Sequence, residues 1–132
     1  MEITNLLAYN DRKQLREWLE ANHETAKDCW VTVNRSKLVR PDCMSYPEAV
    51  EEALCFGWID STLKRMPDGR YAQRLSPRRK NSHWTERNRL RCADLLARGL
   101  MTDSGLKAMN NSLPARGTIG FAVLYPQGVR SA

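Results

Sequence analysis

The chain has 132 residues, of which 42% are hydrophobic and 27% are charged, and its formal net charge at pH 7 is +6. This length is typical of one domain, and no apolar run approaches the roughly 20 residues that are needed to cross a bilayer. Because the N-terminus carries neither a basic leader nor a long apolar segment, we expect a soluble, cytoplasmic, single-domain protein without a membrane span.

The first predicted elements are a helix and a strand. Asp11, followed three residues later by Gln14, is a variant of the capping box that starts helices. Apolar residues then recur at the spacing of one helical face, at Leu15, Trp18 and Leu19. We therefore predict a helix over residues 12–21. The run of aromatic and β-branched residues at 29–33 favours a strand.

A second helix is predicted over residues 46–55. Ser45 supplies the N-cap, a proline occupies the first turn, and Glu48 completes a capping box. Gly57 suits the left-handed position that commonly follows a helix. The face turned toward the core is predicted to consist of Val50, Ala53 and Leu54.

A β-hairpin is predicted next, with strands at 58–66 and 70–75. Pro67 fixes φ in the connecting turn, and Gly69 accepts a left-handed conformation there. Together with the strand at 29–33, the hairpin gives a small, largely antiparallel sheet covered by helices. The predicted fold class is therefore α+β.

Two more helices complete the predicted domain. Thr85 can cap a third helix that ends at Gly99, and its inward face is predicted to carry Leu90, Ala93, Leu96 and Ala97. Thr102 can cap a shorter helix over residues 103–111.

The domain boundary is predicted from the end of this periodicity. After residue 112 prolines and glycines are frequent and no period is visible. We expect one α+β domain over residues 1–112 and an irregular C-terminal tail over 113–132.

The four cysteines show no metal-ligand spacing. Cys29, Cys43, Cys55 and Cys92 are unevenly spaced, and the chain has only two histidines to complete a ligand set. We expect buried, reduced thiols, and we expect neither a metal site nor a cofactor.

Positive charge is concentrated in one segment. Residues 61–100 contain eleven Lys or Arg and three Asp or Glu, a net charge of +8, whereas the rest of the chain is slightly acidic. Such asymmetry is typical of a surface that meets an anion, and equally of a solvated face that keeps a protein soluble.

The first candidate site is the pair Trp58 and Asp60. The two side chains share a face if the strand has the usual period of two. The carboxylate could orient a ligand donor or act as a general base. Alternatively, Asp60 pairs with a nearby arginine, and Trp58 packs over the preceding helix and is largely buried.

The second candidate is a group of cations after the hairpin. Pro77 holds Ser76 in an extended shape that presents the cations Arg74, Arg78, Arg79 and Lys80. Arginine suits phosphate and carboxylate, and the helix start at Thr85 would add free N–H groups. Alternatively, this segment is a solvated basic turn.

The third candidate is the start of the helix after Thr85. The indole of Trp84 could stack on a base, a sugar face or a planar ligand, with Arg87 and Asn88 beside it. Alternatively, Trp84 is a hydrophobic staple that anchors the helix. His83 has no visible partner, and no motif of a known catalytic centre is present, so no catalytic residue is assigned.

Three motifs of this region resemble one known family. Residues 53–60 read ALCFGWID, residues 76–79 read SPRR, and residues 84–88 read WTERN. This order resembles the YdeI/OmpD-associated (OmdA) family, also called bacteriocin-protection proteins, over most of residues 30–110. The resemblance implies a role in stress or antimicrobial resistance. Many members continue into a further basic helical segment, most of which this chain lacks.

The leading prediction is a small binding module for an anionic ligand, either phosphate-containing or a carboxylate. Its basic, tryptophan-rimmed cleft would be made by the strand at Trp58, the Pro77 loop and the helix after Thr85. Nucleic-acid binding is an alternative that the basic segment and its tryptophans support less strongly. An enzyme that uses Asp60 is a further alternative, and the oligomeric state stays open.

Overall fold

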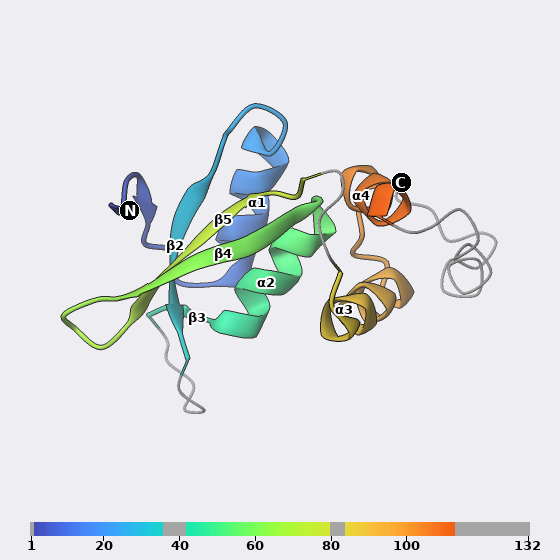
Figure 1. Ribbon diagram of the computed structural model, residues 1–132. Coiled ribbons are helices and arrows are strands. Elements are labelled where there is room, and N and C mark those ends of the chain that lie inside the picture. The colour runs from blue at the N-terminus through green and yellow to red at the C-terminus, as the bar shows by residue number, and fades with distance from the viewer. Residues whose placement is uncertain (1, 36–41, 80–83, 113–132) are drawn as a thin grey trace.

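The computed structural model describes residues 2–35, 42–79 and 84–112, the last three of them by backbone alone. The predicted tail, 113–132, lies outside the described residues. Four helices and five strands in these segments confirm the predicted α+β class (Figure 1). The helices are α1 (Arg12–Asn22), α2 (Tyr46–Cys55), α3 (Glu86–Ala97) and α4 (Asp103–Ser112). The strands are β1 (Leu6–Leu7), β2 (Cys29–Asn34), β3 (Met44–Ser45), β4 (Trp58–Arg65) and β5 (Tyr71–Pro77).

The described strands form one sheet in the order β1-β2-β5-β4, and β3 also pairs with β2. The β2–β5 and β5–β4 ladders are antiparallel, and only the two-residue strands β1 and β3 pair in parallel. The predicted largely antiparallel sheet and its hairpin are therefore confirmed. The second hairpin strand runs on to Pro77, two residues beyond the predicted end.

Capping residues that are recognisable in the sequence begin helices α1 and α2. At α1, Asp11 Oδ1 accepts a hydrogen bond from the Gln14 backbone N–H at 3.1 Å. At α2 the capping box is complete, because Ser45 Oγ accepts from the Glu48 N–H at 3.3 Å and Glu48 Oε1 accepts from the Ser45 N–H at 2.9 Å. Gly57 follows α2 at φ +76°, the left-handed conformation expected there.

The core lies between the sheet and the helices. α1 and α2 lie along the sheet, while α3 and α4 lie beyond the end where β4 begins (Figure 1). The predicted inward residues of α1 and α2 are buried in one cluster with sheet residues, except that Trp18 is only partly buried. None of the four described helices combines the length and hydropathy that a membrane-spanning helix requires.

The cysteines are part of this interior. All four thiols are buried, as predicted. Burial raises the pKa of Cys29 and Cys92 to about 12 and that of Cys55 to about 11. These three side chains are therefore neutral at physiological pH, which suits a packing role.

Trp58 is a core residue, as the structural alternative predicted. Its side chain is 1% exposed, and it meets Trp18 edge to face with 5.9 Å between ring centroids. Its indole N–H donates to the His23 backbone carbonyl at 3.3 Å. The N–H that burial would otherwise leave unsatisfied is thus paired.

The inward face of α3 differs from the prediction. Leu90 is 61% exposed, and Ala97 is exposed as well. The buried residues are Cys92, Leu95 and Leu96. Two apolar stripes overlap on this helix, and packing against α2 determines which of them is buried. The spacing of the apolar residues alone therefore could not predict the buried stripe.

α4 approaches α2 closely because glycine lies at the junction. A Cβ at Gly57 would be 2.8 Å from the Ser104 carbonyl oxygen, and one at Gly105 would collide with the Cys55 carbonyl and the Met101 sulfur. The Thr102 hydroxyl donates to the same Cys55 carbonyl. This junction fixes α4 against the C-terminal end of α2.

An ion network joins α1 to α2. The Glu52 carboxylate is buried and accepts from Arg12 Nε at 2.7 Å and from Arg16 at 3.0 Å. Arg16 also donates to the Leu100 carbonyl at 2.7 Å. Two cations therefore satisfy the buried charge of Glu52.

Candidate anion-binding pocket

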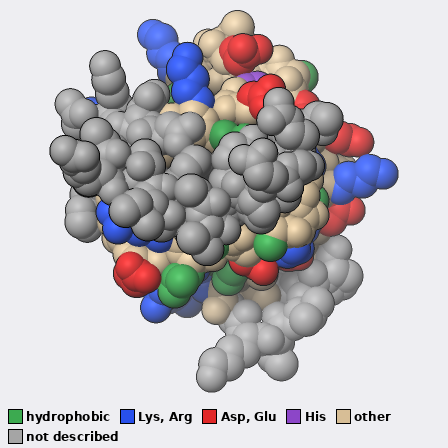
Figure 2. All heavy atoms as spheres, turned by 90° about the vertical axis from the view of Figure 1, so that its right-hand side faces the viewer, with side chains coloured by type: hydrophobic (Ala, Val, Ile, Leu, Met, Phe, Trp, Pro, Cys, Tyr) green, Lys and Arg blue, Asp and Glu red, His purple; other side chains and the backbone are tan. Residues whose placement is uncertain are grey.

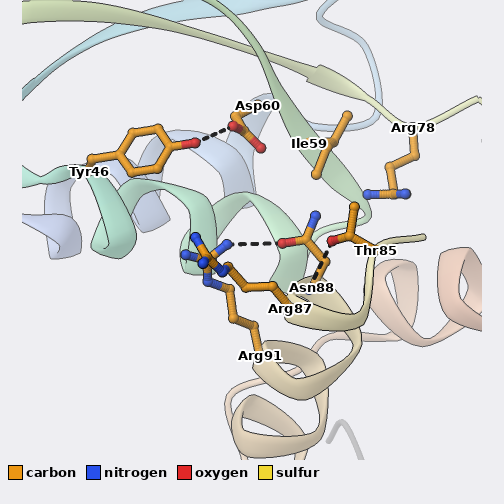
Figure 3. A pocket seen from close by; sticks show the side chains of 8 residues that line it. All are labelled: Tyr46, Ile59, Asp60, Arg78, Thr85, Arg87, Asn88 and Arg91. Carbon is orange, nitrogen blue, oxygen red and sulfur yellow. Dashed lines mark hydrogen bonds between the residues drawn. The ribbon is translucent and has the colours of Figure 1, made fainter. Parts of the chain in front are cut away.

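One pocket lies where the start of α2, β4, the residues after β5 and the start of α3 meet (Figure 3). Its volume is about 510 Å³, which falls in the usual range for small-molecule sites. It is lined by Tyr46, Ile59, Asp60, Arg78, Thr85, Arg87, Asn88 and Arg91. The cleft predicted from β4, the Pro77 loop and α3 is therefore present, with the start of α2 as a fourth wall.

A second hollow adjoins the first. Its volume is about 380 Å³, and it shares Tyr46, Arg87 and Arg91 with the pocket. It adds Arg35, whose guanidinium carbon lies 5.5 Å from the ring centroid of Tyr46 and 5.8 Å from that of Tyr71. Four arginines line the two hollows together, namely Arg35, Arg78, Arg87 and Arg91.

Arg78 lies at the wall of the pocket and contacts both the backbone of Gly57 and the ring of Trp84. Its backbone N–H donates to the Gly57 carbonyl at 3.0 Å, and its guanidinium carbon lies 3.9 Å from the ring centroid of Trp84. Burial lowers the pKa of Arg78 from its ordinary value. An arginine remains charged at neutral pH under such a shift, so Trp84 supports a cation with a fixed orientation.

The start of α3 forms the floor of the pocket. Thr85 Oγ accepts from the Asn88 backbone N–H at 3.1 Å, which confirms Thr85 as the N-cap. Arg91 donates to Asn88 Oδ1 at 3.0 Å. The first N–H groups of a helix have no partner within the helix, so this end adds partial positive charge to that of the arginines.

Tyr46 and Asp60 form the polar upper wall. The Tyr46 hydroxyl donates to Asp60 Oδ2 at 2.5 Å. Burial and, next, the hydrogen bond to Asp60 raise the pKa of Tyr46 to about 12, while Arg91 and Arg35 oppose the shift. The phenol is therefore a hydrogen-bond donor at neutral pH, and Asp60 has a tyrosine as its partner where an arginine was the predicted alternative.

The pocket brings together four of the nine predicted ligand-binding residues and holds a fifth against its wall. Asp60, Arg78, Arg87 and Asn88 line it. Trp84 lies behind Arg78 with 6% of its surface exposed, so the guanidinium occupies the ring face that was proposed for a base or a sugar.

The remaining predicted residues lie elsewhere. Trp58 shares a strand face with Asp60 as expected, but its indole is buried in the core. Arg74 points to the opposite face of the sheet from Asp60, because Asp60 is paired with Leu75, and it donates to Asp28 at 2.9 Å. Arg79 is exposed outside the lining, and Lys80 lies outside the described residues.

Four lining residues were not among the predicted ligand-binding residues, although one of them, Thr85, was predicted as the helix cap. Arg91 follows Arg87 by four positions, so helical spacing could have placed it on the same face. Ile59 is the neighbour of Asp60 in β4. Tyr46 had no such signal, because only the packing of α2 against β4 brings it to Asp60.

The pocket lining carries more positive than negative charge. Three arginines line the pocket against a single carboxylate, Asp60. Figure 2 views the molecule from the side of α3 and α4, and its visible Lys and Arg side chains are interspersed with Asp and Glu. The described part of that face therefore carries charges of both signs.

The chain belongs to the family described as a domain of unknown function, DUF8412. The model of this family matches residues 7–108, a range that contains every residue lining the pocket. No curated protein and no solved structure matches the chain.

Proposed function

We propose that this protein is a small binding module for an anionic ligand that carries phosphate or carboxylate groups. The observation that supports this most is the pocket charge, because Arg78, Arg87 and Arg91 face a single carboxylate beside a helix start. Arginine offers planar, paired donors to such anions, and a helix start adds backbone N–H groups.

Preorganisation supports the same proposal. The guanidinium of Arg78 lies on Trp84, and the side chain of Asn88 receives a hydrogen bond from Arg91. Side chains that are already ordered lose less conformational entropy when a ligand binds. The pocket volume of about 510 Å³ suits a metabolite-sized anion.

The biological setting is a proposal that depends on the motif resemblance. We propose a cytoplasmic role in stress or antimicrobial resistance, as the resemblance to the bacteriocin-protection proteins implies. Nucleic-acid binding has less support, because the pocket of about 510 Å³ suits a metabolite-sized anion and the described surface on the side of α3 and α4 carries charges of both signs (Figure 2). Catalysis by Asp60 has less support, because its carboxylate already accepts the Tyr46 hydroxyl.

The proposal is tested by ligand-induced thermal shift and calorimetry with phosphate, sulfate and citrate. A ligand that binds only the folded state raises its stability as the site saturates. We expect Arg91→Gln, which removes a charge from the lining of the pocket, to weaken or abolish this response. Arg79→Gln is the matched control, because it removes the same charge from an exposed residue outside the pocket.

Two outcomes would count against the proposal. One is that the unmodified protein shows no shift and no heat with any of the three anions. The other is that Arg91→Gln and Arg79→Gln respond alike, which would make the basic segment a solvated face.

A further inference from the structure

The cations of the pocket lie at two ends. In Figure 3 the guanidinium of Arg78 is at one end, beside Thr85. The guanidinium groups of Arg87 and Arg91 are at the other, below Tyr46 and Asp60. A single small anion such as phosphate can contact only one of these two ends, whereas a longer ligand with an anionic group at each end can contact both.

The two ends carry unequal charge. The adjoining hollow continues from Arg87 and Arg91 to Arg35, so three arginines serve that end. At the opposite end Arg78 acts with the first N–H groups of α3, whose cap is Thr85. A ligand with one anionic group is therefore expected at the Arg87 and Arg91 end.

The space between the ends has a different chemistry. It presents the apolar side chain of Ile59, the amide of Asn88 and the carboxylate of Asp60. Tyr46 donates to one oxygen of Asp60, and a carboxylate has further acceptor sites. A negative charge in this position is repelled, whereas a hydroxyl group can donate to Asp60.

From this arrangement, and on the basis of the function proposed above, we infer that the ligand carries two anionic groups at the ends of a hydroxyl-bearing chain. One anionic group binds Arg78 and the start of α3, and the other binds Arg87 and Arg91 with Arg35 beside them. Asp60 is the specificity-determining residue, because it accepts from the central hydroxyls and excludes central negative charge. A sugar bisphosphate has this chemistry.

The experiment compares ribulose bisphosphate with ribulose monophosphate by calorimetry. The two sugars share a hydroxylated chain and differ in one terminal phosphate. We expect the bisphosphate to bind at least about tenfold more tightly, because hydrogen bonds between charged groups contribute a difference of this order. Arg78→Gln should reduce the affinity for the bisphosphate to that for the monophosphate and leave the latter unchanged. Arg91→Gln should weaken the binding of both sugars, and the control Arg79→Gln should leave the binding of both unchanged.

A second arm tests Asp60. Pentane bisphosphonate has two anionic ends and no hydroxyl group, so the unmodified protein should bind it less tightly than ribulose bisphosphate. Asp60→Asn removes the charge and keeps the size, and it should reduce this preference by about tenfold. Circular dichroism and urea unfolding establish that each variant is folded. The comparison of ligands on the unmodified protein tests the inference without any variant.

The outcomes separate this inference from the proposed function. Equal affinity for the bisphosphate and the monophosphate overturns the two-ended ligand and leaves an anion-binding module. Equal losses for both sugars in Arg78→Gln also overturn it. An unchanged preference in Asp60→Asn overturns the role of Asp60. If neither the sugars nor phosphate, sulfate or citrate bind, the proposed function fails as well.

Discussion

Tyr46 links the pocket to the stability of the fold at the scale of a single residue. Its pKa is raised to about 12 in the folded protein, whereas an unfolded chain titrates near pH 10. As pH rises, the unfolded form loses this proton first. The contribution of the phenol to the free energy of unfolding is therefore complete below about pH 10 and is lost between about pH 10 and 12.

Tyr46→Phe tests this pH dependence, because phenylalanine cannot titrate. Urea unfolding of both proteins is measured from pH 8 upward, and the difference between them cancels the titration of other groups. We expect the stability advantage of the unmodified protein to shrink above about pH 10. A difference that stays constant to pH 12 would show that the phenol is not perturbed.

Trp58 should contribute strongly to the free energy of unfolding, because it packs in the core between α1 and β4. Its indole is 1% exposed, contacts Trp18 and donates to the His23 carbonyl. Trp58→Ala should lower the free energy of unfolding by about 3 to 5 kcal/mol. Trp58→Phe keeps an aromatic ring and should cost less. An unchanged urea midpoint in the alanine variant would contradict the assignment of Trp58 to the core.

The junction of α2 and α4 gives a prediction at the scale of elements. An alanine in place of a helical glycine ordinarily stabilises by about 1 kcal/mol. At Gly105 the added Cβ would meet the Cys55 carbonyl and the Met101 sulfur, so we expect Gly105→Ala to destabilise by about 1 to 3 kcal/mol. Lys107→Ala, on the exposed side of α4, is the control, and a stabilising Gly105→Ala would refute the close approach.

The elements that could be predicted are those with local signals. α1 and α2 start at the caps Asp11 and Ser45, and the hairpin turns at a Pro-Asp-Gly sequence. β1 and β3 could not be predicted, because each has two residues and exists only through its pairing with β2. The predicted inward face of α3 was wrong at Leu90, because packing against α2 buries the stripe that contains Cys92, Leu95 and Leu96 instead.

The same distinction holds for the pocket at the scale of the whole molecule. Arg78, Arg87 and Asn88 were predictable, because they surround the helix start at Thr85 in sequence. Tyr46 was not, since it reaches Asp60 only when α2 packs beside β4. Two arginines of the second predicted group, Arg74 and Arg79, do not line the pocket. Arg74 lies on the opposite face of the sheet from Asp60, and Arg79 is exposed outside the lining, which composition alone does not show.

The distribution of charge over the molecule predicts weak binding to nucleic acid. Affinity for DNA or RNA grows with the number of phosphates that a basic surface neutralises, and it falls steeply with salt. Here three arginines line one pocket that also contains Asp60, and the visible described surface near α3 and α4 has mixed charge (Figure 2).

We therefore expect at most weak binding to a DNA duplex or to single-stranded RNA at ~0.15 M salt. Fluorescence anisotropy of labelled oligonucleotides, titrated at several salt concentrations, measures it. A submicromolar complex at that salt concentration would favour the nucleic-acid alternative over the small-anion pocket.

The stacking of Arg78 on Trp84 makes the pocket observable without a label. Indole emission depends on the charge near the ring, and the guanidinium carbon of Arg78 lies 3.9 Å from the Trp84 centroid. An anion that neutralises Arg78 changes the electric field at this one fluorophore. The other three tryptophans, Trp18, Trp30 and Trp58, line no part of the pocket, so they supply a constant background. The protein thus contains its own optical reporter of occupancy.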